Sequence, residues 1–231
     1  MRKILLSVGL ILCFAVAFGQ GAESGMFKLR SGISVPLGSY GKNGGTLDYS
    51  GFVGRGTNFG AEAVYFYGEH VGFGGLLSYS SFKLDNERFA GAYVNSNINY
   101  DTAFINVNPF RTLVGVVGFY FDLPVGDYFA FTMKMMVGSH IVQKPAGVVT
   151  VENRVSSAIN FVETSTISSK FALYTGCGFR VNPYENWSIT ADIEYVGSKL
   201  SFEYKENANA VRNEKNIKTL VFSFGIAYFI E

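Results

Sequence analysis

The chain of 231 residues contains little charge, little histidine and almost no cysteine. Charged residues make up 16% of the sequence, whereas a typical soluble domain has about 25%. One of the two cysteines, Cys13, lies in an N-terminal apolar stretch, so Cys177 stands alone and neither a disulfide nor a cysteine-bound metal is expected. After residue 18, no apolar run approaches the roughly 20 residues that a membrane-spanning helix needs. These absences exclude a disulfide scaffold and a helical membrane protein.

Aromatic residues and glycine are abundant instead. The sequence has 22 Phe, 14 Tyr and 27 Gly, and aromatics account for 16% of it. A transmembrane β-barrel needs aromatic girdles at the membrane interfaces and small residues where side chains crowd the lumen. In residues 219–230, every second position is large and apolar while the positions between are mostly small, as in a strand with one face toward lipid.

The N-terminus has the features of an export signal. Arg2 and Lys3 precede an apolar run over residues 4–18, which Gly19 and Gly21 end. We expect a cleaved signal peptide at 1–20 and one barrel domain at 21–231. A lipoprotein anchored at Cys13 is the alternative, although Leu12 is not the small residue that such sites have before the cysteine. Without Arg2 and Lys3, 17 basic residues face 18 acidic ones, so no nucleic-acid partner is expected.

The mature chain shows alternation of period two in eight segments, separated by connections of alternating length. Short turns follow the second, fourth and sixth strands, and long polar segments follow the first, third, fifth and seventh, which is the topology of outer-membrane barrels. We predict an all-β fold: an eight-stranded antiparallel transmembrane up-and-down β-barrel with four long outer loops and three short periplasmic turns. The start of the fourth strand is open because Pro109 cannot sit in a central ladder. The predicted strands are 26–35, 59–67, 71–82, a fourth that ends at 121, 128–140, 171–181, 187–202 and 219–230, and the long segments are 37–58, 83–111, 141–169 and 203–216.

Several charged side chains fall on the inward faces of these strands, with Tyr174 near them. A lumen of eight strands is only wide enough to hold side chains, and charges removed from water must be paired. We therefore predict an ion-pair network that fills the lumen, with a selectivity ring or a proton path as the alternative. Its members are Glu62, Lys134, Arg180, Asp192 and Glu194.

No sequence motif indicates catalysis, a cofactor or a metal. Phosphate-binding loops, zinc signatures, dinucleotide fingerprints and nucleophile elbows are missing. His70 and His140 fall at opposite ends of the barrel, about 25 Å apart, so they cannot share a metal. Ser139 and His140 are adjacent and face opposite ways, which suits a nucleophile and its base poorly. We expect no enzyme, with a lipid-modifying activity at the outer rim left as an alternative.

The mature chain resembles the small porin-like outer-membrane β-barrel families common in Bacteroidetes. The similar stretches are VGVVGFYFDLPVGDYFAFTMKMMVGSH, SSKFALYTGCGFRVNPYENWSITADIEYVGSK and the terminal LVFSFGIAYFI. The residues Ser223, Gly225, Tyr228 and Ile230 also resemble the C-terminal signal by which Gram-negative barrels are recognised for insertion.

This resemblance implies a monomer in the outer membrane that contacts lipid and, during assembly, the barrel-insertion machinery. The role expected from it is non-catalytic: envelope structure, or surface binding through the long loops. A narrow pore or a barrel that transports hydrophobic solutes is the alternative.

Overall fold

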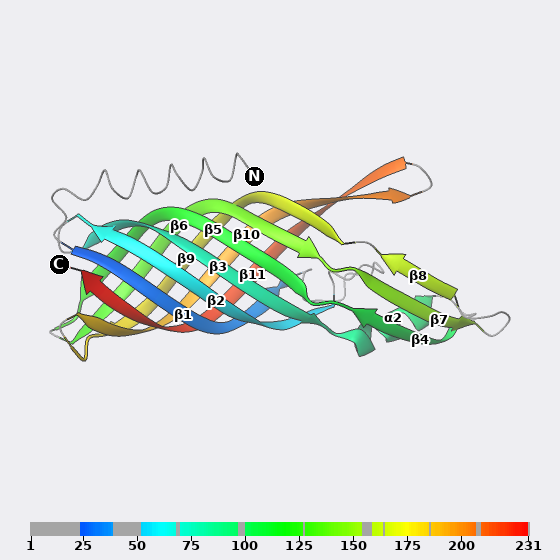
Figure 1. Cartoon of the computed structure of the whole chain (residues 1–231), viewed down its shortest axis with the longest axis horizontal. Coiled ribbons are helices and arrows are strands. Elements are labelled where there is room, and N and C mark those ends of the chain that lie inside the picture. The colour runs from blue at the N-terminus through cyan, green and yellow to red at the C-terminus, as the bar shows by residue number, and fades with distance from the viewer. Residues whose placement is uncertain are drawn as a thin grey trace.

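Eight strands close into an antiparallel barrel, which confirms the predicted fold (Figure 1). The computed structural model describes residues 24–38, 52–67, 70–96, 100–126, 128–153, 159–163, 165–184, 186–206 and 209–230. The predicted signal peptide at 1–20 therefore lies outside the described residues. Around the barrel the order is β1-β11-β10-β9-β6-β5-β3-β2. The strands are β1 (Ser24–Leu37), β2 (Val53–Phe66), β3 (Val71–Leu84), β5 (Phe110–Pro124), β6 (Phe129–Lys144), β9 (Thr166–Val181), β10 (Trp187–Glu206) and β11 (Asn209–Ile230).

Alternation along each strand sorts the side chains between the lumen and the outer surface. On β11, Phe224 and Ile226 are 72% and 57% exposed, whereas Ser223 and Ala227 are buried. Because the sheet closes on itself, one face of every strand is inside and the other forms a continuous apolar belt. None of the described helices is long and apolar enough to cross a membrane.

The first and last barrel strands close the sheet, and the start of β1 and the end of β11 lie at the same end of the barrel. β1 pairs with β11 from Gly25, opposite Ile230, to Leu37, opposite Lys218. The three short connections, between β2 and β3, β5 and β6, and β9 and β10, lie at this same end. This end is therefore the periplasmic end, and the long segments lie on the outer side.

The outer side contains regular structure that the sequence did not lead us to expect. A second sheet has the order β4-β7-β8, and a helix contacts β4. β4 and β7 continue the β5–β6 ladder beyond Pro109 and Pro145, where the Asn108 amide donates to the Ala146 carbonyl at 3.3 Å. Proline lacks a backbone N–H, so these neighbouring prolines end the barrel ladder and fix the start of β5 at Phe110. The added elements are α2 (Asn86–Ser96), β4 (Tyr100–Val107), β7 (Gly147–Asn153) and β8 (Ile159–Glu163).

An apolar cluster fills the barrel where it meets this outer sheet. Phe89 of α2 packs on Phe52, with ring centroids 4.9 Å apart. The strands supply the other members from their outer ends, so the mouth of the barrel contains a small hydrophobic core. We call this cluster the outer cap; its buried members are Phe52, Val53, Phe82, Phe89, Phe110, Val142, Val151 and Ile217.

Candidate functional site in the barrel interior

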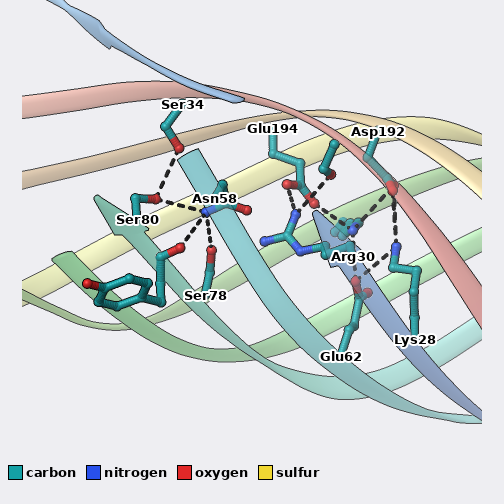
Figure 2. A network of polar contacts seen from close by, with 12 residues as sticks. Lys28, Arg30, Ser34, Asn58, Glu62, Ser78, Ser80, Asp192 and Glu194 are labelled. Carbon is teal, nitrogen blue, oxygen red and sulfur yellow. Dashed lines mark hydrogen bonds and ion pairs between the residues drawn. The ribbon is translucent and has the colours of Figure 1, made fainter. Parts of the chain in front are cut away.

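Six charged side chains meet in the lumen, and Figure 2 labels most of them. They come from four strands whose inward positions carry them because of the alternation described above. Their ion pairs join side chains that are 0% exposed, and three cations face three carboxylates. We call this group the central cluster: Lys28 and Arg30 of β1, Glu62 of β2, Lys134 of β6, and Asp192 and Glu194 of β10.

Lys134 is the hub of the central cluster. Its Nζ lies 2.9 Å from Oε2 of Glu62, 2.7 Å from Oε1 of Glu194 and 3.4 Å from Oδ1 of Asp192.

Two cations of β1 complete the pairing of these carboxylates. The Nζ of Lys28 lies 3.0 Å from Oε2 of Glu62 and 3.2 Å from Oδ2 of Asp192. Arg30 pairs with Glu194. Each carboxylate therefore contacts two cations, as buried charges require.

Glycine and tyrosine positions shape the space that holds the cluster. A Cβ at Gly60 would lie 2.7 Å from Nε of Arg30, and one at Gly176 would lie 2.8 Å from Cγ of Glu194. Two fully buried rings flank the cations, because Nζ of Lys134 is 5.9 Å from the centroid of Tyr120 and Cζ of Arg30 is 5.9 Å from that of Tyr174. Close backbone packing and cation–π contact thus accompany charges that have no exposure to bulk solvent.

Arg180 does not belong to the central cluster, contrary to the sequence-based prediction. It pairs with Asp122, donates to Oδ1 of Asn182 at 3.1 Å and lies 4.5 Å from the centroid of Phe229, toward the periplasmic end. Side-chain exposure in this pair is 10% for Arg180 and 7% for Asp122.

The sequence reasoning missed three charged members of the interior. Lys28 and Arg30 alternate with Phe27 and Leu29, so their inward position was readable from the period of β1. Asp122 falls after the predicted end of the fourth strand, and only the observed length of β5 reveals it. With these additions the described interior pairs contain four cations and four acids, whereas the sequence predicted two cations and three acids.

A neutral polar layer lies between the central cluster and the outer cap. Nδ2 of Asn58 donates to Oγ of Ser78 and to Oγ of Ser80, both at 2.8 Å, and Oγ of Ser34 lies 3.0 Å from Oγ of Ser80. Figure 2 shows this group beside the charges. The lumen is therefore filled in sequence by a pair near the periplasm, a charged centre, a hydroxyl-rich layer and an apolar cap.

The structure joins His140 to a serine other than its neighbour. Nδ1 of His140 lies 2.7 Å from Oγ of Ser198 on β10, whereas Ser139 faces outward and contacts Ser169 at 2.9 Å. No carboxylate in the described part of the chain hydrogen-bonds to His140, so the third member of a catalytic triad is missing there. Nor do the described residues include a group of three His, Cys, Asp or Glu that could hold a metal ion.

The residues of the predicted insertion signal lie on β11 and alternate between the two surfaces. Ser223 and Gly225 face the lumen, while Tyr228 and Ile230 are 37% and 57% exposed on the outer face. The ring of Tyr228 contacts that of Trp187, with centroids 5.0 Å apart. These aromatic residues stand at the periplasmic end of the belt, where an interfacial girdle is expected.

Comparison with known proteins agrees with this architecture. The sequence matches the family described as "Outer membrane protein beta-barrel domain" over residues 8–228. Neisserial surface protein A is similar in fold, with a TM-score of 0.50 at 10% identity over 88% of this chain and 96% of that one. For Ail of Yersinia pestis the TM-score is 0.46 and the sequence identity 15%, over 90% of this chain and 98% of that one. For OprG of Pseudomonas aeruginosa the TM-score is 0.49 and the sequence identity 13%, over 92% of this chain and 99% of that one. No curated protein matches the sequence.

Proposed function

This chain belongs to the outer membrane β-barrel protein family, and from that premise we propose that it is a monomeric, non-catalytic barrel with a closed lumen. The membrane it occupies is the outer membrane, where its apolar belt contacts lipid. Its role in this proposal is to hold the outer sheet, α2 and the end of the β10–β11 hairpin at the cell surface, where they bind a partner.

The filled interior is the observation that supports a closed lumen. Every carboxylate of the central cluster contacts two cations, and those six charges balance. An open channel would hydrate such charges rather than pair them in a site without solvent exposure. The outer cap adds a barrier without polar side chains, since Phe82, Phe89 and Phe110 are at most 2% exposed.

Single-channel recording in planar bilayers tests the closed lumen. The purified, refolded protein should show no steps of conductance, while a water-filled porin reconstituted in the same way should conduct. Steps of porin size from the folded protein would refute the proposal and favour a narrow pore.

The elements beyond the barrel support surface binding. β4, β7 and α2 lie past the outer rim, and the β10–β11 hairpin diverges from them (Figure 1). One face of the outer sheet is exposed: Phe104 is 61% and Val148 40% exposed. An epitope tag inserted between β7 and β8 should bind antibody on intact cells, whereas one in the turn between β2 and β3 should need a permeabilised outer membrane. The opposite pattern would reverse the topology and remove these elements from the surface.

The contact between His140 and Ser198 supplies the test of a non-catalytic role. A lipid-modifying serine hydrolase would need this imidazole as its base. His140→Ala should therefore leave the mass-spectrometric lipid A profile of expressing cells unchanged relative to wild type. A profile that changes on expression of wild type and reverts with His140→Ala would replace the proposal with an enzymatic one.

A second candidate function, passage of hydrophobic solutes through the barrel wall, rests on the β9–β10 ladder. Its described pairing ends at Ala172, opposite Ser198, although β9 begins at Thr166 and β10 continues to Glu206. A disulfide between Phe171→Cys and Lys199→Cys, the next pair in this register, would hold the strands together. If solutes pass here, oxidation should block entry of a hydrophobic fluorescent probe into vesicles, and reduction should restore it.

A further inference from the structure

Over the part of the barrel strands whose burial is described, the outward face carries charge of one sign. This part is 25–37, 53–66, 71–84, 110–124, 129–144, 166–181, 187–199 and 216–230, and its four acids, Glu62, Asp122, Asp192 and Glu194, are all buried in the lumen. In these segments the charged residues at outward positions of the alternation are all basic and exposed. They are Arg55, Lys83, Arg111, Lys199 and Lys218.

Three of these cations lie on neighbouring strands and form a compact group. β2, β3 and β5 are consecutive in the barrel, and they carry Arg55, Lys83 and Arg111. Val53 pairs with Leu84 and Gly56 with Phe82, so Gly54 and Arg55 form a bulge opposite Lys83. Ser81 pairs with Arg111, so Lys83 is diagonal to Arg111. Cross-strand neighbours are about 5 Å apart at Cβ and diagonal neighbours about 7–8 Å, within reach of one bound group. We call this group the basic patch.

The basic patch stands where the apolar belt ends on the outer side. On the same outward faces, moving along the strands toward the middle of the membrane, the next large side chains are Phe59, Tyr79 and Leu113. They are 56%, 40% and 36% exposed. The patch therefore lies at the level of the lipid headgroups of the outer leaflet.

No group in the described part of the chain neutralises the patch. Among the described residues, Arg55, Lys83 and Arg111 make no hydrogen bond or ion pair, although other charges of this chain are paired. Like charges placed side by side on a sheet destabilise it. An arrangement of three adjacent cations without an acid is therefore best explained by an anion from outside the chain.

We propose that the basic patch binds the phosphate groups of a phosphorylated glycolipid in the outer leaflet of the outer membrane. Two guanidinium groups can each bind phosphate oxygens in a bidentate manner, and the ammonium between them adds a third donor. The lipid's acyl chains would then lie along Phe59, Tyr79 and Leu113. The site is distinct from the lumen and does not rest on the proposed closed barrel.

Native mass spectrometry of the detergent-solubilised full chain tests this site with lipid A as the probe. Arg55→Gln/Arg111→Gln should weaken binding of bis-phosphorylated lipid A by about tenfold or more, as expected when about 1.4 kcal/mol or more of binding is lost. The matched control Lys199→Gln/Lys218→Gln removes the same charge from β10 and β11 and should have little effect. Wild type should also bind dephosphorylated lipid A less tightly than the bis-phosphorylated form.

Separate measurements distinguish the sources of the anion and exclude a folding defect. In zwitterionic detergent without lipid A, Arg55→Gln/Arg111→Gln should be at least as stable as wild type, because repulsion is relieved. Inorganic phosphate should compete with lipid A poorly, since it lacks acyl chains. Equal losses in the two double variants, or equal binding of both forms of lipid A, would overturn the proposal, as would full displacement by inorganic phosphate.

Discussion

Replacement of Lys134 by methionine tests whether the central cluster is dry. Methionine keeps the unbranched stem but removes the ammonium that contacts Glu62, Asp192 and Glu194. Three carboxylates would then face two cations, leaving one uncompensated negative charge among side chains that are 0% exposed. Breaking a buried ion pair in this way costs about 3–5 kcal/mol. We expect the free energy of unfolding of the folded barrel to fall by this amount.

The assay is urea unfolding in phospholipid vesicles, followed by the fluorescence of Trp187, the one tryptophan of the chain. Lys170→Met is the matched control, because Lys170 is exposed and its loss should cost at most about 1 kcal/mol. Glu62→Gln in the Lys134→Met background restores the charge balance, so the double variant should be more stable than the sum of the single effects indicates. The reasoning would be refuted if Lys134→Met lowered the free energy of unfolding by less than about 1 kcal/mol and the effects of the two substitutions simply added in the double variant. That result would mean that water solvates the cluster.

Three further predictions concern other parts of the molecule. Arg180→Ala should lower the midpoint of the heat-induced mobility shift on gels, because Asp122 would remain buried without its partner; the effect should shrink when Asp122→Asn is added. Phe89→Ala should remove about 3–5 kcal/mol of packing from the outer cap and speed protease cleavage within 86–107, leaving the barrel intact. Cys177, exposed on the outer face, should react in membranes with a lipid-soluble maleimide and resist a charged one.

Each of these three predictions has its own contrary result. An unchanged midpoint for Arg180→Ala would show that the pair is solvated at the periplasmic end. Unaltered cleavage within 86–107 after Phe89→Ala would mean that the outer cap does not hold α2 in place. Rapid labelling of Cys177 by the charged maleimide would put this face of β9 in water rather than in lipid.

The barrel itself could be predicted because period two is a local signal. Alternating residues on β11, such as Phe222, Ser223 and Phe224, show which face is buried without any knowledge of the neighbouring strands. Connection length added the second constraint, since short and long connections alternated around the chain. Strand ends were less accurate: β2 was expected to begin at 59 and begins at Val53, because the bulge between Val53 and Gly56 interrupts the alternation.

The partners of the interior charges could not be predicted in the same way. An inward position is a property of one strand, but the contact between Lys28 and Asp192 spans 164 residues and depends on the tilt and stagger of the closed barrel. The same limit applies to His140, whose partner Ser198 lies on a strand with which β6 has no ladder. The outer sheet was missed for a different reason: Pro109 and Pro145 break the alternation, so β4 and β7 did not appear as continuations of barrel strands.

The charges of the central cluster are sorted by strand, and this has a consequence for how the barrel assembles. β1 contributes only cations, Lys28 and Arg30, and β10 contributes only acids, Asp192 and Glu194. A partly assembled sheet that contains one of these strands without the other holds excess charge of one sign on its inner face. The inner face becomes neutral only when the sheet contains both β1 and β10, and each charge finds its partner only in the native register. A slip of two residues would keep every side chain on its proper face but would leave one cation of β1 and one acid of β10 without its partner. The cluster would therefore favour one register when the barrel closes. The apolar belt cannot distinguish registers that differ by two residues in this way, because its large side chains repeat at every second position.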